Sequence, residues 1–290
     1  MKFTVKKYSL ILCLFAIFFV FLPTINVANA YQSMPFYNLK PKEIVFRSSF
    51  YTSYYNSSEE RKSNISLACK SLDNTIVDVN GEFSFNNTVG ERTEKRGYKK
   101  AKIIVGGEFV DGVGGGVCQV STTLYNAVLL SGLKVIEYHP HSLPVSYVAP
   151  SFDAMVNSSY ADLRFVNNTN NPIIIKAYAD GSKLKIEIYG EEMKEKYERE
   201  SQITQTITSP GYIYKVDYEN NYPELKRGEQ KIISYAKDGY YSNGVLIKKV
   251  NGKVVSRKKI RNDRYLAVRG VVIEGTTMIE EENIATENPN

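Results

Sequence analysis

Tryptophan is absent from this chain of 290 residues, and histidine and cysteine are scarce, with two and three residues respectively. Three cysteines are too few for the disulfide framework of a small secreted domain. The formal net charge of +6 is far below the basic character typical of a nucleic-acid-binding protein, so no nucleic-acid partner is expected. Any chemistry that needs a thiol or an imidazole therefore depends on very few residues.

The first thirty residues have the pattern of a secretory signal peptide. Lys2, Lys6 and Lys7 precede an apolar run, and residues 28–30 supply the small side chains of a cleavage site. An uncleaved membrane anchor is the alternative, and it is the less favoured one because the apolar run is short for a transmembrane helix. We expect a secreted, extracytoplasmic protein, and its net charge of about +3 after cleavage would suit an anionic cell wall.

Hydrophobic periodicity predicts an α+β domain followed by a small, extended all-β module. In the domain, residues 57–190, two main helices (residues 59–72 and 117–131) are expected against a mostly antiparallel sheet. Strands are expected at residues 43–46, 102–105, 134–138, 144–148, 161–165, 173–178 and 183–189, and the Asn80–Gly81 turn predicts a hairpin. The remaining segments are a signal peptide (1–30), an N-terminal linker and strand (31–56), a charged linker (191–202), the β module (203–275) and a disordered tail (276–290).

Cys118 follows a glycine run at the expected start of the second helix, in the segment GVGGGVCQVSTTLYNA. A helix N-terminus favours a thiolate over a thiol, and glycines let a substrate approach the backbone closely. Cys118 is therefore a candidate nucleophile, and a small buried thiol is the alternative. Cys69 lies on an apolar helical stripe and is expected in the core, although a Cys69–Cys118 disulfide is also open.

Both histidines, His139 and His141, lie at the end of the strand that follows the Cys118 helix. This unit can bring a histidine back to the cysteine, with His141 as the preferred base and His139 as the second candidate. Asp153 and Asp162 are candidates for the carboxylate that orients the histidine. A zinc site built from the cysteine, the histidines and an aspartate is an alternative, but the spacing matches no common zinc motif. No metal or cofactor is predicted.

Other candidate residues surround the proposed nucleophile. The backbone N–H of Cys118 and the side chain of Gln119 are candidate oxyanion donors. The candidate substrate-binding residues lie in the glycine run, along the helix or near His141, and comprise Gly114, Gly115, Gly116, Ser121, Thr122, Tyr125, Ser142 and Asp153.

These motifs resemble those of the VanW family. The resemblance covers about residues 64–189 and rests on GEFSFNNTVGERTEKRGYKKA, GVGGGVCQVSTTLYNAVLLSGL and HPHSLPVSYV. Residues 203–274 are similar, more loosely, to wall-associated modules named for five glycines. The resemblance implies a Gram-positive cell-envelope protein with a link to glycopeptide resistance. This chain departs from the family pattern at Tyr138, where arginine is common, and at Ser151 and Phe152, since glycine often precedes the residue that corresponds to Asp153.

Some VanW domains are thought to be cysteine L,D-transpeptidases that act on peptidoglycan stem peptides. On that resemblance, the Cys118 thiolate attacks the carbonyl after the third stem residue, and an amine of a neighbouring stem resolves the thioester. The C-terminal module would contact glycan. Two other functions remain open, a cysteine peptidase or carboxypeptidase of peptidoglycan and a non-enzymatic protein that binds peptidoglycan or a glycopeptide.

Overall fold

The computed structural model describes residues 44–105 and 107–278 of the chain. The predicted signal peptide lies outside the described residues, as do most of the predicted N-terminal linker and C-terminal tail. Within the described part of the chain, no helix is both long and apolar enough to cross a membrane.

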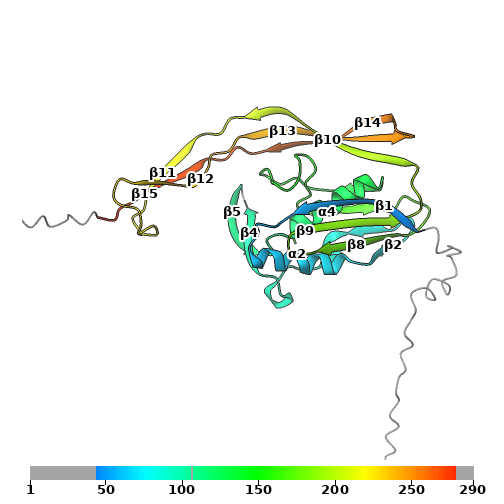
Figure 1. Cartoon of the computed structure of the whole chain (residues 1–290), viewed down its shortest axis with the longest axis horizontal. Coiled ribbons are helices and arrows are strands. Elements are labelled where there is room, and N and C mark those ends of the chain that lie inside the picture. The colour runs from blue at the N-terminus through cyan, green and yellow to red at the C-terminus, as the bar shows by residue number, and fades with distance from the viewer. Residues whose placement is uncertain (1–43, 106, 279–290) are drawn as a thin grey trace, which may run out of the picture. The chain divides into compact units, whose positions relative to one another are not determined.

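A four-stranded antiparallel sheet carries the two main helices of the first domain (Figure 1). Its strand order is β1 (Val45–Ser53), β9 (Lys183–Gly190), β8 (Ile173–Ala179) and β2 (Thr75–Val77). Helix α2 (Glu59–Leu72) packs on β8, helix α4 (Val117–Leu130) packs on β1 and β9, and the helices contact each other. The predicted α+β architecture with two main helices is confirmed.

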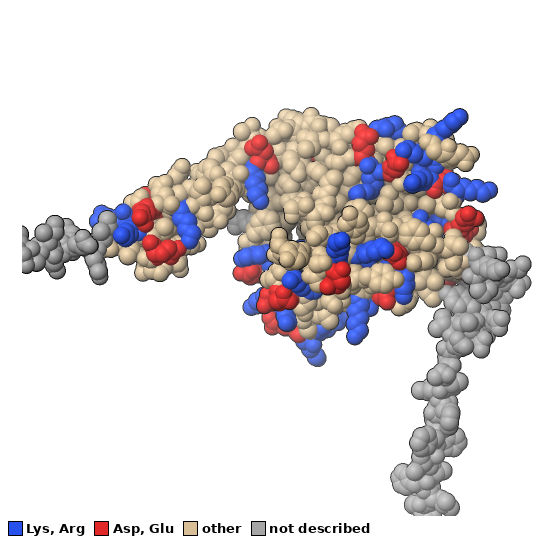
Figure 2. Space-filling view, in the orientation of Figure 1, with Lys and Arg blue, Asp and Glu red and all other residues tan. Residues whose placement is uncertain are grey.

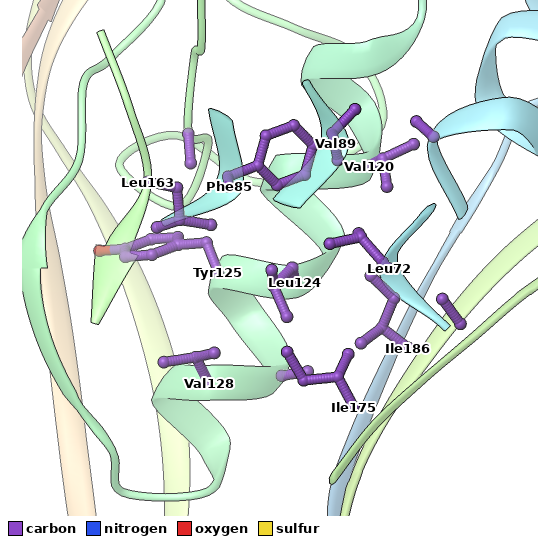
Figure 3. Close-up of a cluster of buried hydrophobic side chains, with 14 of the residues drawn as sticks. Leu72, Phe85, Val89, Val120, Leu124, Tyr125, Val128, Leu163, Ile175 and Ile186 are labelled. Carbon is purple, nitrogen blue, oxygen red and sulfur yellow. The ribbon is translucent and has the colours of Figure 1, made fainter. Parts of the chain in front are cut away.

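The core of this domain lies between the helices and the sheet. In Figure 3, Leu72 of α2 and Leu124 of α4 lie close to Ile175 and Ile186 of the sheet, and all four side chains are fully buried. Full burial of a side chain of this size contributes roughly 1.5–3 kcal/mol. The helices are therefore firmly fixed on the sheet, and with them the N-terminus of α4.

The first helix forms where the sequence predicts it. The Ser58 hydroxyl accepts a hydrogen bond from the backbone N–H of Arg61, and Glu59 and Glu60 occupy the first turn, where the helix dipole favours carboxylates. Cys69 is buried on the apolar face of this helix, as expected, and both Cys69 and Cys118 are free thiols. The alternative of a Cys69–Cys118 disulfide is wrong.

The predicted hairpin at Asn80–Gly81 is also wrong. Strand β2 pairs with β8, whereas β3 (Glu82–Ser84) joins a separate sheet with β7 (Arg164–Val166) and β6 (Lys134–Glu137). Asn80 and Gly81 both bond to the backbone of Asn167, so the turn connects two sheets. Residues 85–89 form the short helix α3 (Phe85–Val89), and residues 94–96 form the 3-10 turn η2 (Glu94–Arg96).

Two further segments differ from the prediction. The chain before the glycine run forms a hairpin of β4 (Lys100–Val105) and β5 (Glu108–Val113), and the second of these strands was not predicted. Residues 144–148, predicted as a strand, form no strand and follow bends and irregular backbone.

The C-terminal part contains two three-stranded sheets, and contacts place it in the same unit as the first domain. One sheet has the order β10 (Glu195–Ile207), β13 (Gly239–Val250), β14 (Lys253–Tyr265). The other has the order β11 (Tyr212–Val216), β15 (Gly270–Glu274), β12 (Gln230–Ser234). We call them the proximal and the distal sheet. The predicted all-β module is confirmed.

The predicted charged linker at residues 191–202 is wrong from residue 195 onward, because β10 begins there. Its acidic side chains form ion pairs across the proximal sheet, Glu195 with Lys248, Glu198 with Lys249 and Glu200 with Arg257. Figure 2 shows basic and acidic side chains mixed over the end of β14. The first residues of the predicted tail are also ordered, since the Thr276 hydroxyl donates to the Asp217 carbonyl at 2.8 Å.

Candidate active site

The glycine run turns the chain sharply from β5 into α4. Gly114 and Gly116 have φ angles of 87° and 110°, which L side chains rarely adopt, and Gly116 is the N-cap of α4. A Cβ atom at Gly115 would lie 2.7 Å from the backbone carbon of Ala101, so no side chain fits there. The turn places Cys118 in the first turn of α4.

The Cys118 thiol donates to the Val156 carbonyl oxygen at 3.3 Å, and the His141 imidazole lies close enough to act on the pKa of the thiol. The backbone N–H of Cys118 has no acceptor among the described residues. A thiol with a base beside it and a free N–H donor at a helix N-terminus is suited to nucleophilic attack on a carbonyl.

His141 is held from the opposite side by Asp153. The His141 Nδ1 atom lies 2.7 Å from Asp153 Oδ2, and the same oxygen accepts the backbone N–H of His141 at 2.6 Å. Because the carboxylate occupies Nδ1, Nε2 is the ring nitrogen left for the cysteine. His141 and Asp153 are 5% and 1% exposed. Cys118, His141 and Asp153 therefore have the arrangement that a nucleophile, a base and an orienting carboxylate have in a catalytic triad.

The charges of this triad favour a thiolate–imidazolium pair. Burial alone would raise the pKa of Cys118, but the hydrogen bond and charge of His141 lower it below the usual value. Burial alone would lower the pKa of His141, but its bonds to Asp153 and Cys118 raise it to about 9. Burial would raise the pKa of Asp153, yet His141, Arg261 and Tyr265 lower it. Asp153 therefore stays ionised and supports the imidazolium.

Side chains of α4 hold the segment that carries Asp153. The Ser121 hydroxyl donates to the Ala154 carbonyl at 2.6 Å, and the Thr122 hydroxyl accepts the Ala154 N–H at 2.9 Å. Asn126 donates to the Phe152 carbonyl at 2.8 Å. Ser121 and Thr122 are fully buried and do not line the cleft, so they position Asp153 and do not face a substrate.

The proximal sheet completes the surroundings of Asp153. The Tyr265 hydroxyl donates to Asp153 Oδ1 at 2.5 Å, and Arg261 donates both to the Asp153 carbonyl and, at 3.4 Å, to Oδ1. Arg261 also donates to Asp263 at 2.8 Å. Arg261 and Tyr265 are 2% and 1% exposed. The carboxylate that orients His141 is thus itself held by two residues of β14.

The sequence interpretation missed Arg261 and Tyr265, because they lie 108 and 112 residues from Asp153. The local sequence carries no signal of this contact. Arg261, Asp263 and Tyr265 alternate along a strand and share one face, and charged side chains at alternate positions are typical of a solvent-exposed face.

Two other predicted residues serve the framework. The Gln119 amide donates to the Thr52 hydroxyl and the Ser53 carbonyl at 3.0 and 2.9 Å, and its oxygen accepts from Arg61 at 2.9 Å. Gln119 therefore fastens α4 to β1, and its amide is not free to bind an oxyanion. Tyr125 is 1% exposed, with the Arg261 guanidinium 5.5 Å from its ring centre, so it lies in the contact with the proximal sheet.

The second histidine and the second aspartate lie outside the site. His139 Nε2 is 3.0 Å from Glu137 Oε1, and His139 does not line the cleft. Asp162 accepts from the Ser84 hydroxyl at 2.5 Å and from the Asn86 N–H at 2.9 Å, so it caps α3. Of the residues of the zinc alternative, His139 is not brought to Cys118 and His141, and no group of three His, Cys, Asp or Glu side chains that could hold a metal ion is found among the described residues.

A cleft of about 1190 Å³ opens beside Cys118 and His141. Of the candidate oxyanion and substrate-binding residues, Gly114, Gly116, Gln119 and Ser142 line it, whereas Gly115 does not. Its wall contains no aspartate or glutamate among the described residues, and its basic residues are Arg61, Arg92, Lys102, Lys237 and Arg264. The cleft is therefore suited to an anionic ligand.

Comparisons with known proteins match both parts of the chain. Residues 60–189 match the family model described as "VanW like protein", and residues 200–277 match the model described as "G5 domain". The uncharacterized protein YoaR of Bacillus subtilis is 47% identical over 144 residues, which cover 49% of this chain and 48% of that protein. The vancomycin B-type resistance protein VanW of Enterococcus faecalis is 24% identical over 163 residues, with coverage of 54% and 59%.

The chain thus spans about half the length of the curated relatives that it matches. A solved G5 domain of an IgA1 protease is 23% identical and covers 29% of this chain and 90% of that one. Its TM-score of 0.18 is too low to support a structural argument.

Proposed function

We propose that this chain, whose residues 60–189 match the VanW model and residues 200–277 the G5 model, is a secreted cell-wall enzyme, a cysteine-dependent L,D-transpeptidase of peptidoglycan stem peptides. The observation that carries the proposal is the Cys118–His141–Asp153 triad, whose cysteine and histidine line a basic cleft while Asp153 is buried behind them. The resemblance supplies the substrate, and the geometry supports the reaction type.

In the first step, the Cys118 thiolate attacks the carbonyl carbon of the third stem residue. The S–C bond forms, the C–N bond to the terminal D-alanine breaks, and the His141 imidazolium gives its proton to the leaving amine. The N–H of Cys118 can stabilise the oxyanion that develops on the carbonyl oxygen. Asp153 keeps the His141 ring oriented throughout.

In the second step, the side-chain amine of a neighbouring stem attacks the thioester. Neutral His141 takes the proton of the amine, the new C–N bond forms, and the C–S bond breaks to restore the thiolate. Water in place of the amine would make the protein a carboxypeptidase. The cleft volume of about 1190 Å³ exceeds the usual size of a small-ligand pocket, which supports room for both a donor and an acceptor.

The test is the intact mass of the protein after incubation with a stem tetrapeptide. The wild-type protein is expected to carry the tripeptide acyl group on Cys118, and Cys118→Ala is expected to carry none while it keeps its thermal unfolding midpoint. The matched control is Cys69→Ala, which should keep the adduct because burial raises the pKa of Cys69 to about 12. Cross-linking by Cys118→Ala would refute the mechanism.

The products separate the remaining alternatives. Cross-linked muropeptide dimers support transpeptidation, and shortened monomers support a carboxypeptidase. A folded wild-type protein with neither adduct nor product, but with affinity for peptidoglycan, would support a non-enzymatic binding protein.

A further inference from the structure

We infer that Arg92 binds the C-terminal carboxylate of the acyl donor, so that the site accepts peptides that end one residue after the scissile bond. This inference rests on the proposed function and gives it a substrate class. It predicts that donors with a blocked C-terminus, or with a chain that continues past the scissile bond, are poor substrates.

Only one nitrogen of the Arg92 guanidinium, Nη1, forms the hydrogen bonds that hold the group in place. Its Nη1 atom donates to Asn86 Oδ1 at 2.9 Å and to the Gly90 carbonyl at 3.2 Å. The Nη2 and Nε atoms have no partner in the part of the chain that the structure describes. Arg92 lines the same cleft as Cys118. A fixed guanidinium with unused donors is prepared for a carboxylate.

No carboxylate of the described residues forms an ion pair with Arg92. Of the five basic residues of the cleft, Lys102 has such a partner, Asp111 at 3.1 Å. Burial lowers the pKa of Arg92, whereas the charges of Cys118 and other neighbours raise it. A half-buried guanidinium without a carboxylate is unfavourable unless another anion neutralises it. A bound anionic ligand would do so.

The position of Arg92 fits the leaving group. In the proposed reaction the bond that breaks joins the attacked carbonyl to the last residue, and one residue spans at most about 3.6 Å. The terminal carboxylate must therefore lie next to the Cys118 sulfur. Arg92 meets this requirement, because a Cβ atom at Gly114 would lie 3.0 Å from the Arg92 Cβ atom, so the Arg92 side chain packs against the glycine run that precedes Cys118.

The other basic residues of the cleft are less suitable. Arg61 is bonded to Gln119, and Lys237 and Arg264 belong to the C-terminal module. A donor whose chain continues past the scissile bond would place a neutral amide against Arg92. Because an unpaired, partly buried charged group is costly, such a donor would be rejected.

The experiment compares a stem tetrapeptide with its C-terminal amide as acyl donors. For the wild-type protein, we expect kcat/KM for thioester formation to be about 10- to 100-fold higher with the free acid. Arg92→Gln should lose this preference, because the free acid falls to the rate of the amide. Arg92→Lys should keep part of the preference for the free acid, since the positive charge stays but the two-pronged guanidinium that can bind a carboxylate through two hydrogen bonds is lost.

The control variant is Arg96→Gln, which removes the same charge from the neighbouring turn η2, does not line the cleft and should keep the preference. Alkylation of Cys118 by iodoacetamide reports on the triad independently of substrate. Equal rates with acid and amide in the wild-type protein, or an unchanged preference in Arg92→Gln, would overturn the inference and leave the proposed function intact. No thioester with either donor in the wild-type protein would instead refute the proposed function.

Discussion

The proximal and distal sheets belong to the same C-terminal module but differ in the burial of their side chains. The proximal sheet buries Ser242, Arg261 and Asp263, together with Tyr265, against the first domain. In the distal sheet, every residue of β11 and β12 is exposed. The large apolar and aromatic side chains of these strands, such as Tyr214 at 68% exposure, face solvent.

The difference teaches that half of the module is part of the triad's support. Burying a charged group is unfavourable unless its partners are well placed, and the partner of Arg261 and Tyr265 is Asp153. Further bonds join the two parts, including Ser151 with Ser242 at 2.6 Å and the Leu266 N–H with the Ser142 carbonyl at 2.8 Å. The residues that support Asp153 therefore come from both of the regions that match family models.

Tyr138 gains a role from this contact. Its hydroxyl donates to the Ile260 carbonyl at 3.3 Å, and the Arg261 guanidinium lies 4.6 Å from its ring centre. The departure from the family pattern at this position thus serves the contact with the proximal sheet.

The two sheets are expected to differ most in how much the loss of one cationic side chain lowers the free energy of unfolding. Arg261→Gln leaves Asp263 and the Asp153 carbonyl without their buried partner, and should lower the free energy of unfolding by about 3–5 kcal/mol. Lys231→Gln in the distal sheet removes an exposed ion pair with Glu224 and should change it little. Urea unfolding of both variants measures the difference. Equal shifts would contradict the distinction between the sheets.

A smaller difference is expected for loss of a hydroxyl. Tyr265→Phe removes a charge-assisted bond of about 1.5–3 kcal/mol to Asp153, and should lower kcat for thioester formation at least tenfold with little change in KM. Tyr214→Phe, the matched change on the exposed strand β11, should leave kcat unchanged. If kcat for thioester formation in Tyr265→Phe also equals that of the wild-type protein, the Tyr265 hydroxyl of β14 does not support the triad.

Local signals account for the parts of the fold and site that could be predicted. The cap and acidic first turn mark α2, and the glycine run marks the start of α4. The proximity of Cys118 and His141 could be predicted because one short helix–strand unit connects them. The sequence already favoured His141 over His139, and in the structure His141 contacts Asp153 whereas His139 contacts Glu137.

Long-range contacts account for the parts that could not be predicted. The charges at residues 195–200 look like a linker, yet they form a strand because β13 and β14 supply matching cations across the sheet. Gln119 looks like an oxyanion donor until Thr52 and Ser53 of β1 are placed against it. No local pattern links Asp153 to Arg261 and Tyr265.

The central claim is that Cys118 is a thiolate because His141, held by Asp153, is its imidazolium partner. Since the pKa of Cys118 is lowered and that of His141 is raised to about 9, the ion pair forms above the first value and is lost as pH rises through the second.

The most direct test is the rate of Cys118 alkylation by iodoacetamide as a function of pH, for the wild-type protein and Asp153→Asn. Cys69 is buried and should not react. The wild-type midpoint is expected below about 8.5, the value of a free cysteine, and Asp153→Asn should move it upward because the imidazolium loses its partner. A wild-type midpoint at or above that of free cysteine, or no shift in Asp153→Asn, would contradict the account.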